Sequence, residues 1–131
     1  MYSFFYQPFT AIFKYLLLIF VLHSSNMFGQ KQVTHLVLFK LKQGVTKADD
    51  RYKLALTKTK VLPRKIMDME DCSMGENFSP RPVAYDFGLS VVFSSRKRLE
   101  NYLIHPAHLE AVEVWKEIAD WNIVDFEDLE E

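Results

Sequence analysis

The segment that most constrains the fold is a run of β-forming residues at positions 33–41, VTHLVLFKL. Alternate residues of a strand point to opposite faces of a sheet. One face carries Val33, His35, Val37, Phe39 and Leu41, and the other carries Thr34, Leu36, Leu38 and Lys40. Both sets are mainly apolar, and a strand with two apolar faces has to be covered on both. The chain therefore needs a sheet with a packed layer on each side of this strand.

The rest of the sequence predicts a β-α-β-β-α-β order. Periodicity, turn residues and caps divide it into a helix at 46–62, strands at 66–78 and 84–93, a helix from Ser94 or Ser95 to Leu103, a helix starting at Pro106, and a strand at 121–126. This order is typical of the ferredoxin-like α+β fold, a four-stranded antiparallel sheet with helices on one face. The apolar residues of the other face then need a different cover. A second copy of the chain is the simplest one, so we expect a homodimer.

Helix boundaries follow from a few residues. Thr46 with Asp49 three positions later is typical of a capping box, and Pro63 is expected to end this first helix. Pro106 suits the first position of a helix, and the residue before a proline is pushed out of the helical region. The second helical unit is therefore expected to break near Ile104 and to restart at Pro106.

The clearest predicted strand is the one at 84–93, where large apolar residues alternate with small or polar ones. Tyr85 shares its parity with Phe87 and Leu89, so we expect it in the core. Asp86 is expected to bond a helix end or to orient a histidine.

His108 lies in the first turn of the helix that starts at Pro106, at the beginning of its buried stripe. The positive end of the helix dipole disfavours an imidazolium there. Against a reference pKa of about 6.5, this position favours a neutral ring that acts as a base or an acceptor. The same spacing also fits a histidine that is merely satisfied inside the core. His105 is expected to cap or brace the helix start.

Residues 1–29 differ in composition from the rest of the chain. They contain no acidic residue, one lysine, Lys14, and an apolar run at 15–22 followed by a short polar stretch. This order is typical of a secretory signal peptide, and the run is short for a bilayer span. We therefore expect a cleaved leader at 1–29 and a folded domain at 30–131, secreted or periplasmic and without a stable membrane anchor. A retained anchor is the alternative.

Charge and cysteine content exclude several classes of function. Without residues 1–29 the chain keeps all 17 acidic residues and 15 of its 16 lysines and arginines, so its net charge is near −2. No nucleic-acid partner is indicated by such a balance. Cys72 is the only cysteine, which excludes an intrachain disulfide and a cysteine-based metal site. His105 and His108 are spaced for shared ligation but no third ligand is evident, so we expect no metal and no other cofactor.

Several segments together resemble the stress-responsive A/B barrel family of dimeric α/β barrels, over about residues 31 to 128. They are VTHLV at 33–37, GENFS at 75–79, Tyr85 with Asp86, and YLIHPAH at 102–108. The resemblance implies two subunits that pack their sheets into a barrel, each with a pocket between sheet and helices.

The family includes plant polyketide cyclases, which close a linear poly-β-ketone by an intramolecular aldol step without a cofactor. Residues that line their active site match His35, Tyr102 and His108 of this sequence, which become the candidate catalytic residues. A tyrosine on the first helix of those cyclases is replaced here, with Thr57 near its place. Those cyclases also act inside cells, whereas this chain carries a predicted leader. The substrate therefore does not transfer with the fold.

Three functions fit these features. The first is an exported protein that binds a small apolar or aromatic molecule in the pocket between sheet and helices. The second is a cofactor-independent cyclase or lyase acting on a β-dicarbonyl, polyketide-like substrate, with His108 as general base and with Tyr102 and His35 donating hydrogen bonds to the enolate. The third is a purely structural dimer made under stress, in which these polar residues are satisfied inside the fold.

Overall fold

The computed structural model describes residues 31–129. The predicted signal peptide lies outside the described residues and stays a prediction. The elements are β1 (Val33–Leu41), α2 (Asp50–Lys60), α3 (Leu62–Lys65), β2 (Asp71–Glu76), β3 (Phe87–Phe93), α4 (Arg96–Leu103), α5 (Pro106–Ile118) and β4 (Ala119–Glu127). With α2 and α3 as one broken helical unit and α4 and α5 as another, the order is β-α-β-β-α-β. The predicted ferredoxin-like α+β fold is confirmed.

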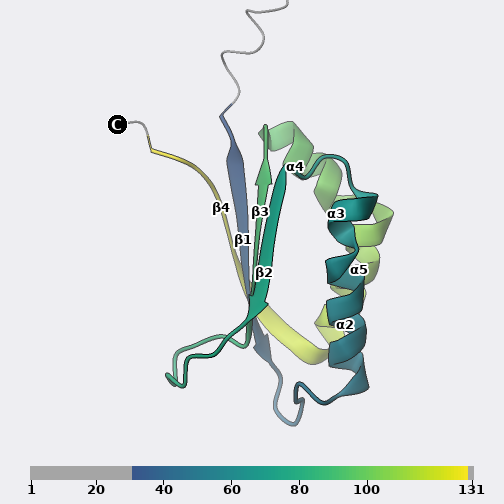
Figure 1. Cartoon of the computed structure of the whole chain (residues 1–131), viewed down its shortest axis with the longest axis vertical. Helices are drawn as coiled ribbons and strands as arrows, with labels where there is room; N and C mark the ends of the chain where they lie inside the picture. Colours follow the sequence, from purple (N-terminus) through teal and green to yellow (C-terminus); the bar gives the residue numbers. More distant parts are fainter. Residues whose placement is uncertain (1–30, 130–131) are drawn as a thin grey trace, which may run out of the picture. The chain divides into compact units, whose positions relative to one another are not determined.

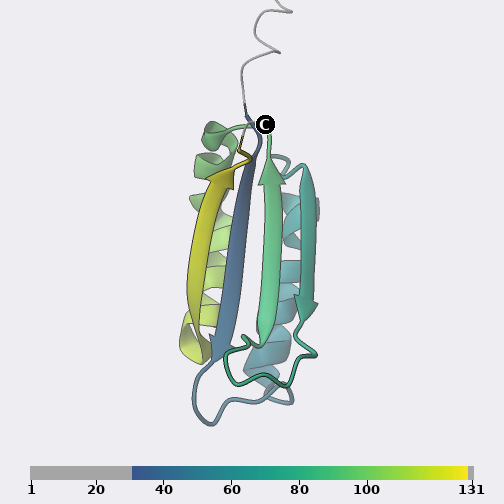
Figure 2. The same cartoon turned by 90° about the vertical axis from the view of Figure 1, so that its left-hand side faces the viewer.

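The four strands form one antiparallel sheet in the order β2-β3-β1-β4. β1 is an inner strand that pairs with β3 on one side and β4 on the other. The helices of the described chain lie on one face of this sheet (Figure 1). The opposite face, which Figure 2 presents to the viewer, carries no helix of residues 31–129. β1 thus has one packed face and one open face.

The core lies between the sheet and the helices. Phe39 of β1 and Phe87 of β3 stack against Trp115 of α5, with ring centroids 4.2 and 5.3 Å apart. The indole N–H of Trp115 donates to the Thr59 hydroxyl of α2 over 2.8 Å. A buried N–H without such a partner would cost stability. This cluster therefore ties both long helices to the middle of the sheet.

The first helix begins later than the sequence predicted. Its N-cap is Asp49, whose carboxylate accepts the backbone N–H of Arg51 over 2.9 Å. Thr46 instead lies in the preceding turn, where its carbonyl accepts the Asp49 N–H, so the predicted capping box is wrong. Pro63 does not end the helical unit but lies in the first turn of α3, where a missing N–H costs nothing. The break predicted before Pro106 is confirmed.

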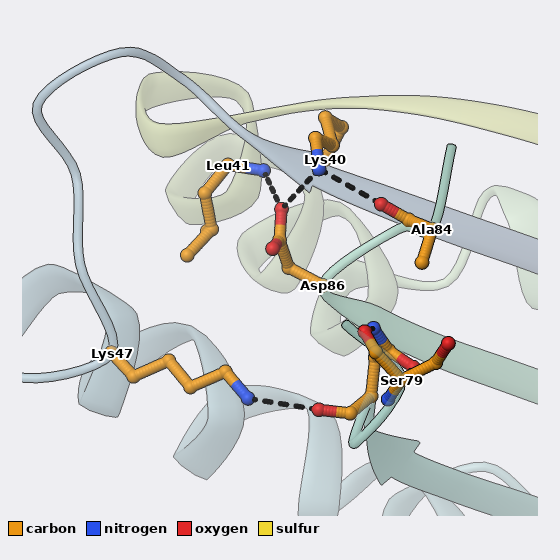
Figure 3. Close-up of polar contacts among 7 residues, drawn as sticks. Lys40, Leu41, Lys47, Ser79, Ala84 and Asp86 are labelled. Atoms are coloured by element: carbon orange, nitrogen blue, oxygen red, sulfur yellow. Dashed lines mark hydrogen bonds and ion pairs between the residues drawn. The ribbon is translucent and has the colours of Figure 1, made fainter. Parts of the chain in front are cut away.

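β2 ends earlier and β3 starts later than predicted because residues 77–86 form an anchored loop between them (Figure 3), and β2 also starts later, at Asp71. The carboxylate of Asp86 accepts the backbone N–H of Leu41 over 2.8 Å and lies 3.7 Å from the Lys40 ammonium. The side chain of Asn77 both accepts the Ser79 N–H and donates to the Ser79 carbonyl. Asp86 therefore fixes the end of β1. It binds neither a helix end nor a histidine, so the prediction for this residue is wrong.

The open face of the sheet carries an apolar patch. Leu36 and Leu38 of β1 are half-buried there, and Leu36 lies opposite Val124 of β4. Val124 and Phe126 on β4 are 54% and 41% exposed. These four side chains are called the outer patch below. Within residues 31–129, none of the helices combines the length and the apolar character that crossing a membrane requires.

Tyr85 was expected in the core, and this prediction is wrong. The residue is half-buried and its hydroxyl accepts a hydrogen bond from the side chain of Asn122 on β4. β3 starts only at Phe87, so the alternation of that strand does not extend back to Tyr85.

Candidate functional site

A cavity of about 220 Å³ lies between the sheet and the helices. Its walls come from strands β1, β3 and β4 and from the helices, and the lining residues are His35, Val37, Phe39, Thr59, Leu62, Leu89, Tyr102, Leu103, His108, Ala111, Val112, Trp115, Trp121 and Ile123. Most of them are apolar, and this set includes no lysine, arginine, aspartate or glutamate. The structure thus brings the three candidate residues His35, Tyr102 and His108 to one space. Their catalytic role stays a prediction.

The break between α4 and α5 positions two of these residues. α4 ends at Leu103, and α5 begins at Pro106 with His105 as its N-cap. The Nδ1 atom of His105 accepts the backbone N–H of Ala107 over 3.1 Å, which confirms its predicted role at the helix start. Because the chain turns here, the last residues of α4 and the first turn of α5 face the same cavity.

His108 is held by the end of the preceding helix. Its Nδ1 atom donates to the backbone carbonyl of Leu103 over 3.1 Å, because a carbonyl only accepts. Carbonyl groups at a helix end lack helical partners, and this side chain supplies one. Burial lowers the pKa of His108 most, the bond to Leu103 opposes this, and the nearby rings of His35 and His105 lower it further. The ring is therefore neutral at neutral pH, and Nε2 is its basic atom.

Tyr102 lies between the two histidine rings and is 1% exposed. Its ring centroid is 4.3 Å from that of His108 and 5.8 Å from that of His35. Burial raises the pKa of its hydroxyl, so the group stays protonated. No group of residues 31–129 makes a hydrogen bond to this hydroxyl. The hydroxyl is therefore an unpaired hydrogen-bond donor on a residue that lines the cavity.

His35 is 2% exposed on β1, and its partner is a residue that the sequence did not reveal. The Nδ1 atom of His35 lies 2.5 Å from the carboxylate of Asp125, which is directly opposite on β4. Asp125 keeps 42% of its side chain exposed. The alternation of β4 could have placed Asp125 on the inner face, but both faces of that strand mix polar and apolar residues. Only the register of β4 against β1 makes the pairing evident.

Thr57, which by the resemblance lies near the position of a pocket tyrosine of the plant cyclases, is not a lining residue of the cavity. It is exposed on α2, and its hydroxyl donates to the backbone carbonyl of Lys53. Thr59 is the residue of α2 that lines the cavity, and its hydroxyl is committed to Ala55 and Trp115. The wall on this side therefore offers no free polar group.

Comparison with known proteins places these features in a family. The sequence model described as stress responsive A/B barrel domain matches residues 33–128. An uncharacterised protein of Streptomyces coelicolor is 38% identical over 95 residues, which cover 72% of this chain and 98% of that protein.

Solved structures show the same fold. A dimeric protein with a ferredoxin-like fold from Bacteroides fragilis is 26% identical, with a TM-score of 0.63, over 76% of this chain and 98% of that one. A hydroxynitrile lyase from Passiflora edulis is 15% identical, with a TM-score of 0.67, over 79% of this chain and 98% of that one.

The lowered pKa of His108 predicts how stability depends on pH. The ring is harder to protonate in the folded chain than in the unfolded chain, so the unfolded chain takes up the proton first as the pH falls. Protonation of this ring should therefore not change the free energy of unfolding above about pH 6.5, and it should reduce the free energy of unfolding below that pH. Denaturant unfolding of the wild type and of His108→Gln at a series of pH values measures this effect.

We expect the wild type to lose more free energy of unfolding than His108→Gln between about pH 7 and about pH 5. In NMR, the His108 ring should titrate below about pH 6.5. A ring that titrates above that value, or two proteins with the same pH dependence, would contradict the assignment.

Proposed function

The chain belongs to the stress-responsive A/B barrel domain family, and we propose that it binds a small apolar or aromatic molecule in the cavity between its sheet and helices. The cavity itself carries this proposal, since apolar walls surround the polar groups of His35, Tyr102 and His108. Ligand sites usually combine apolar walls with a few polar groups that fix orientation. The volume of about 220 Å³ is below the roughly 300–1,000 Å³ of sites for drug-sized ligands. We expect a ligand of about one aromatic ring with short substituents.

A purely structural role accounts less well for this space. Protein interiors are close-packed, and side chains around an empty space lose their contacts on that side. A ligand of the right size restores these contacts and can also form a hydrogen bond with the hydroxyl of Tyr102. The proposal therefore explains the cavity and its polar groups together.

Ala111→Phe should weaken binding strongly. Ala111 is buried on α5 and lines the cavity, so the larger side chain takes the space of the ligand. Acetophenone, benzyl alcohol and indole are suitable probes, followed by thermal shift and calorimetric titration. We expect at least one of them to bind the wild type and its affinity to fall at least about tenfold in the variant.

Val114→Phe is the matched control, because Val114 is half-buried on the same helix but does not line the cavity. It should keep the affinity of the wild type. Failure of every probe to stabilise the wild type, or equal binding by Ala111→Phe, would overturn the proposal.

The environment of His108 favours catalysis as a second candidate function. The ring of His108 is neutral, and its Nδ1 atom donates to the Leu103 carbonyl. The adjacent ring is that of Tyr102, whose hydroxyl is protonated. We propose a cofactor-independent cyclase or lyase acting on a β-dicarbonyl, polyketide-like substrate. His108 would remove a proton α to a carbonyl, and Tyr102 would donate a hydrogen bond to the forming enolate. The hydroxynitrile lyase from Passiflora edulis is an example of an enzyme built on this fold.

His108→Gln should abolish proton abstraction in the cavity. Acetophenone is a single-ring ketone whose methyl protons exchange slowly in neutral water, so deuterium uptake followed by NMR reports the step. We expect the wild type to accelerate exchange, and the variant to lose about 10²- to 10⁴-fold of that acceleration, the usual contribution of a general base.

His105→Gln is the control for this experiment, because His105 caps the helix and is not a lining residue of the cavity. It should retain the acceleration. Exchange that is equally fast with His108→Gln would reject His108 as the base, and a wild type without any acceleration would reject this second function.

We also propose that the chain forms a homodimer through the outer patch, Leu36, Leu38, Val124 and Phe126. These apolar side chains lie on the face that no helix of residues 31–129 covers. The similar protein from Bacteroides fragilis is dimeric, which supports a homodimer. Two copies that pack these faces together would form the predicted α/β barrel. The partner would cover the outer face of β1, and the helices of the same chain cover its inner face.

Leu36→Asp should convert the dimer to a monomer. A carboxylate at the centre of an apolar interface loses its hydration without gaining a partner. Leu54→Asp is the matched control, because Leu54 is exposed on α2, on the other side of the sheet. Analytical ultracentrifugation should show a dimer for the wild type and for Leu54→Asp, and a monomer for Leu36→Asp. A monomeric wild type, or an unchanged dimer with Leu36→Asp, would contradict the proposal.

A further inference from the structure

The partners of the two cavity histidines decide which ring atoms carry hydrogen. An ionised carboxylate only accepts, so the Nδ1 atom of His35 carries the hydrogen that Asp125 receives. A backbone carbonyl also only accepts, so the Nδ1 atom of His108 carries the hydrogen that Leu103 receives. In the neutral form of each ring, Nε2 is then left with a lone pair. Each ring in its neutral form therefore presents an acceptor on the side away from its anchor.

These two Nε2 atoms have no partner within residues 31–129. Every fully buried side-chain nitrogen or oxygen of that part of the chain has a hydrogen bond, so an atom without one touches open space. The hydroxyl of Tyr102 is in the same position. His35, Tyr102 and His108 share one such space, the cavity that all three line. No lysine or arginine is present in this lining to balance an anion.

We infer that Asp125 is a positioning residue that fixes His35 as an acceptor, and that the ligand is an uncharged single-ring or similarly small molecule whose hydroxyl donates to an imidazole Nε2. This inference rests on the proposed binding function and narrows its ligand class. Acceptor-only molecules of the same size leave both ring nitrogens unpaired, and unpaired buried polar groups cost affinity. Carboxylates place a charge where the cavity offers no cation.

Asp125→Asn tests the role of the carboxylate. An amide can donate to Nδ1, which moves the ring hydrogen to Nε2 and turns His35 from an acceptor into a donor. The same exchange of aspartate for asparagine beside the catalytic histidine of serine proteases gives the wrong tautomer. Asp120→Asn is the matched control, because Asp120 lies on the same strand with its side chain on the opposite face of the sheet.

The binding experiment uses phenol, anisole, acetophenone and benzoate as probes of the whole chain. We expect the wild type and Asp120→Asn to bind phenol at least about tenfold more tightly than anisole, and benzoate least of all. In Asp125→Asn the ratio of phenol to acetophenone affinity should fall about tenfold. Equal affinities for phenol and anisole in the wild type, or an unchanged ratio in the variant, would overturn the inference.

NMR of the ring nitrogens provides a readout that does not need a ligand. In the wild type both His35 and His108 should carry hydrogen on Nδ1, and in Asp125→Asn only His35 should change to Nε2. A His35 that already carries hydrogen on Nε2 in the wild type, or no change in the variant, would overturn the role of Asp125. If no probe binds while the tautomers are as expected, the proposed function and the ligand class fail together and the positioning role of Asp125 stands.

Discussion

The structure depends on β1 having two faces that need different surroundings. Paired with β3 and β4, this strand is held in the middle of the sheet, and its inner residues are buried under the helices. The inner face supplies Phe39 to the aromatic cluster that fixes α2 and α5, and it supplies His35 to the cavity. The outer face supplies Leu36 and Leu38 to the outer patch. The strand that organises the core therefore also positions the site and leaves the surface that a second copy would cover.

The break between α4 and α5 brings Tyr102 and His108 to the cavity. A continuous helix would satisfy its own carbonyls and would carry its side chains away at a constant angle. Here α4 ends, Pro106 starts a new helix, and the carbonyl of Leu103 is satisfied by the ring of His108. One hydrogen bond thus gives the carbonyl at the end of α4 a partner and orients the ring of His108. Loss of this bond would leave the Leu103 carbonyl without its partner and would release the candidate base.

The sequence was sufficient for features that depend on local pattern. The bounds of β1, the restart at Pro106 and the capping by His105 follow from alternation, from proline geometry and from capping chemistry, and all three are found. Two other predictions failed for different reasons. Asp49 rather than Thr46 caps α2, because competing local bonds decide where a helix begins. Asp86 binds the backbone of Leu41, a partner far away in the chain that no local pattern defines.

The site shows the same division. Resemblance to a family indicated His35, Tyr102 and His108, and the cavity brings them together. The pairing of His35 with Asp125 required the register between β1 and β4, which no pattern within either strand defines.

Binding and catalysis make the same demands on this cavity, so the ligand decides between them. A neutral His108 with its Nε2 atom free is a hydrogen-bond acceptor toward an O–H group and a base toward an acidic C–H group. Tyr102 can orient a hydroxyl ligand or stabilise an enolate with the same hydroxyl group. Whether the ligand is only bound or also loses a proton then depends on the acidity of the hydrogen that it places at Nε2 of His108. An O–H group that keeps its proton gives a binding protein, and a C–H group between carbonyls gives an enzyme without any change in the protein.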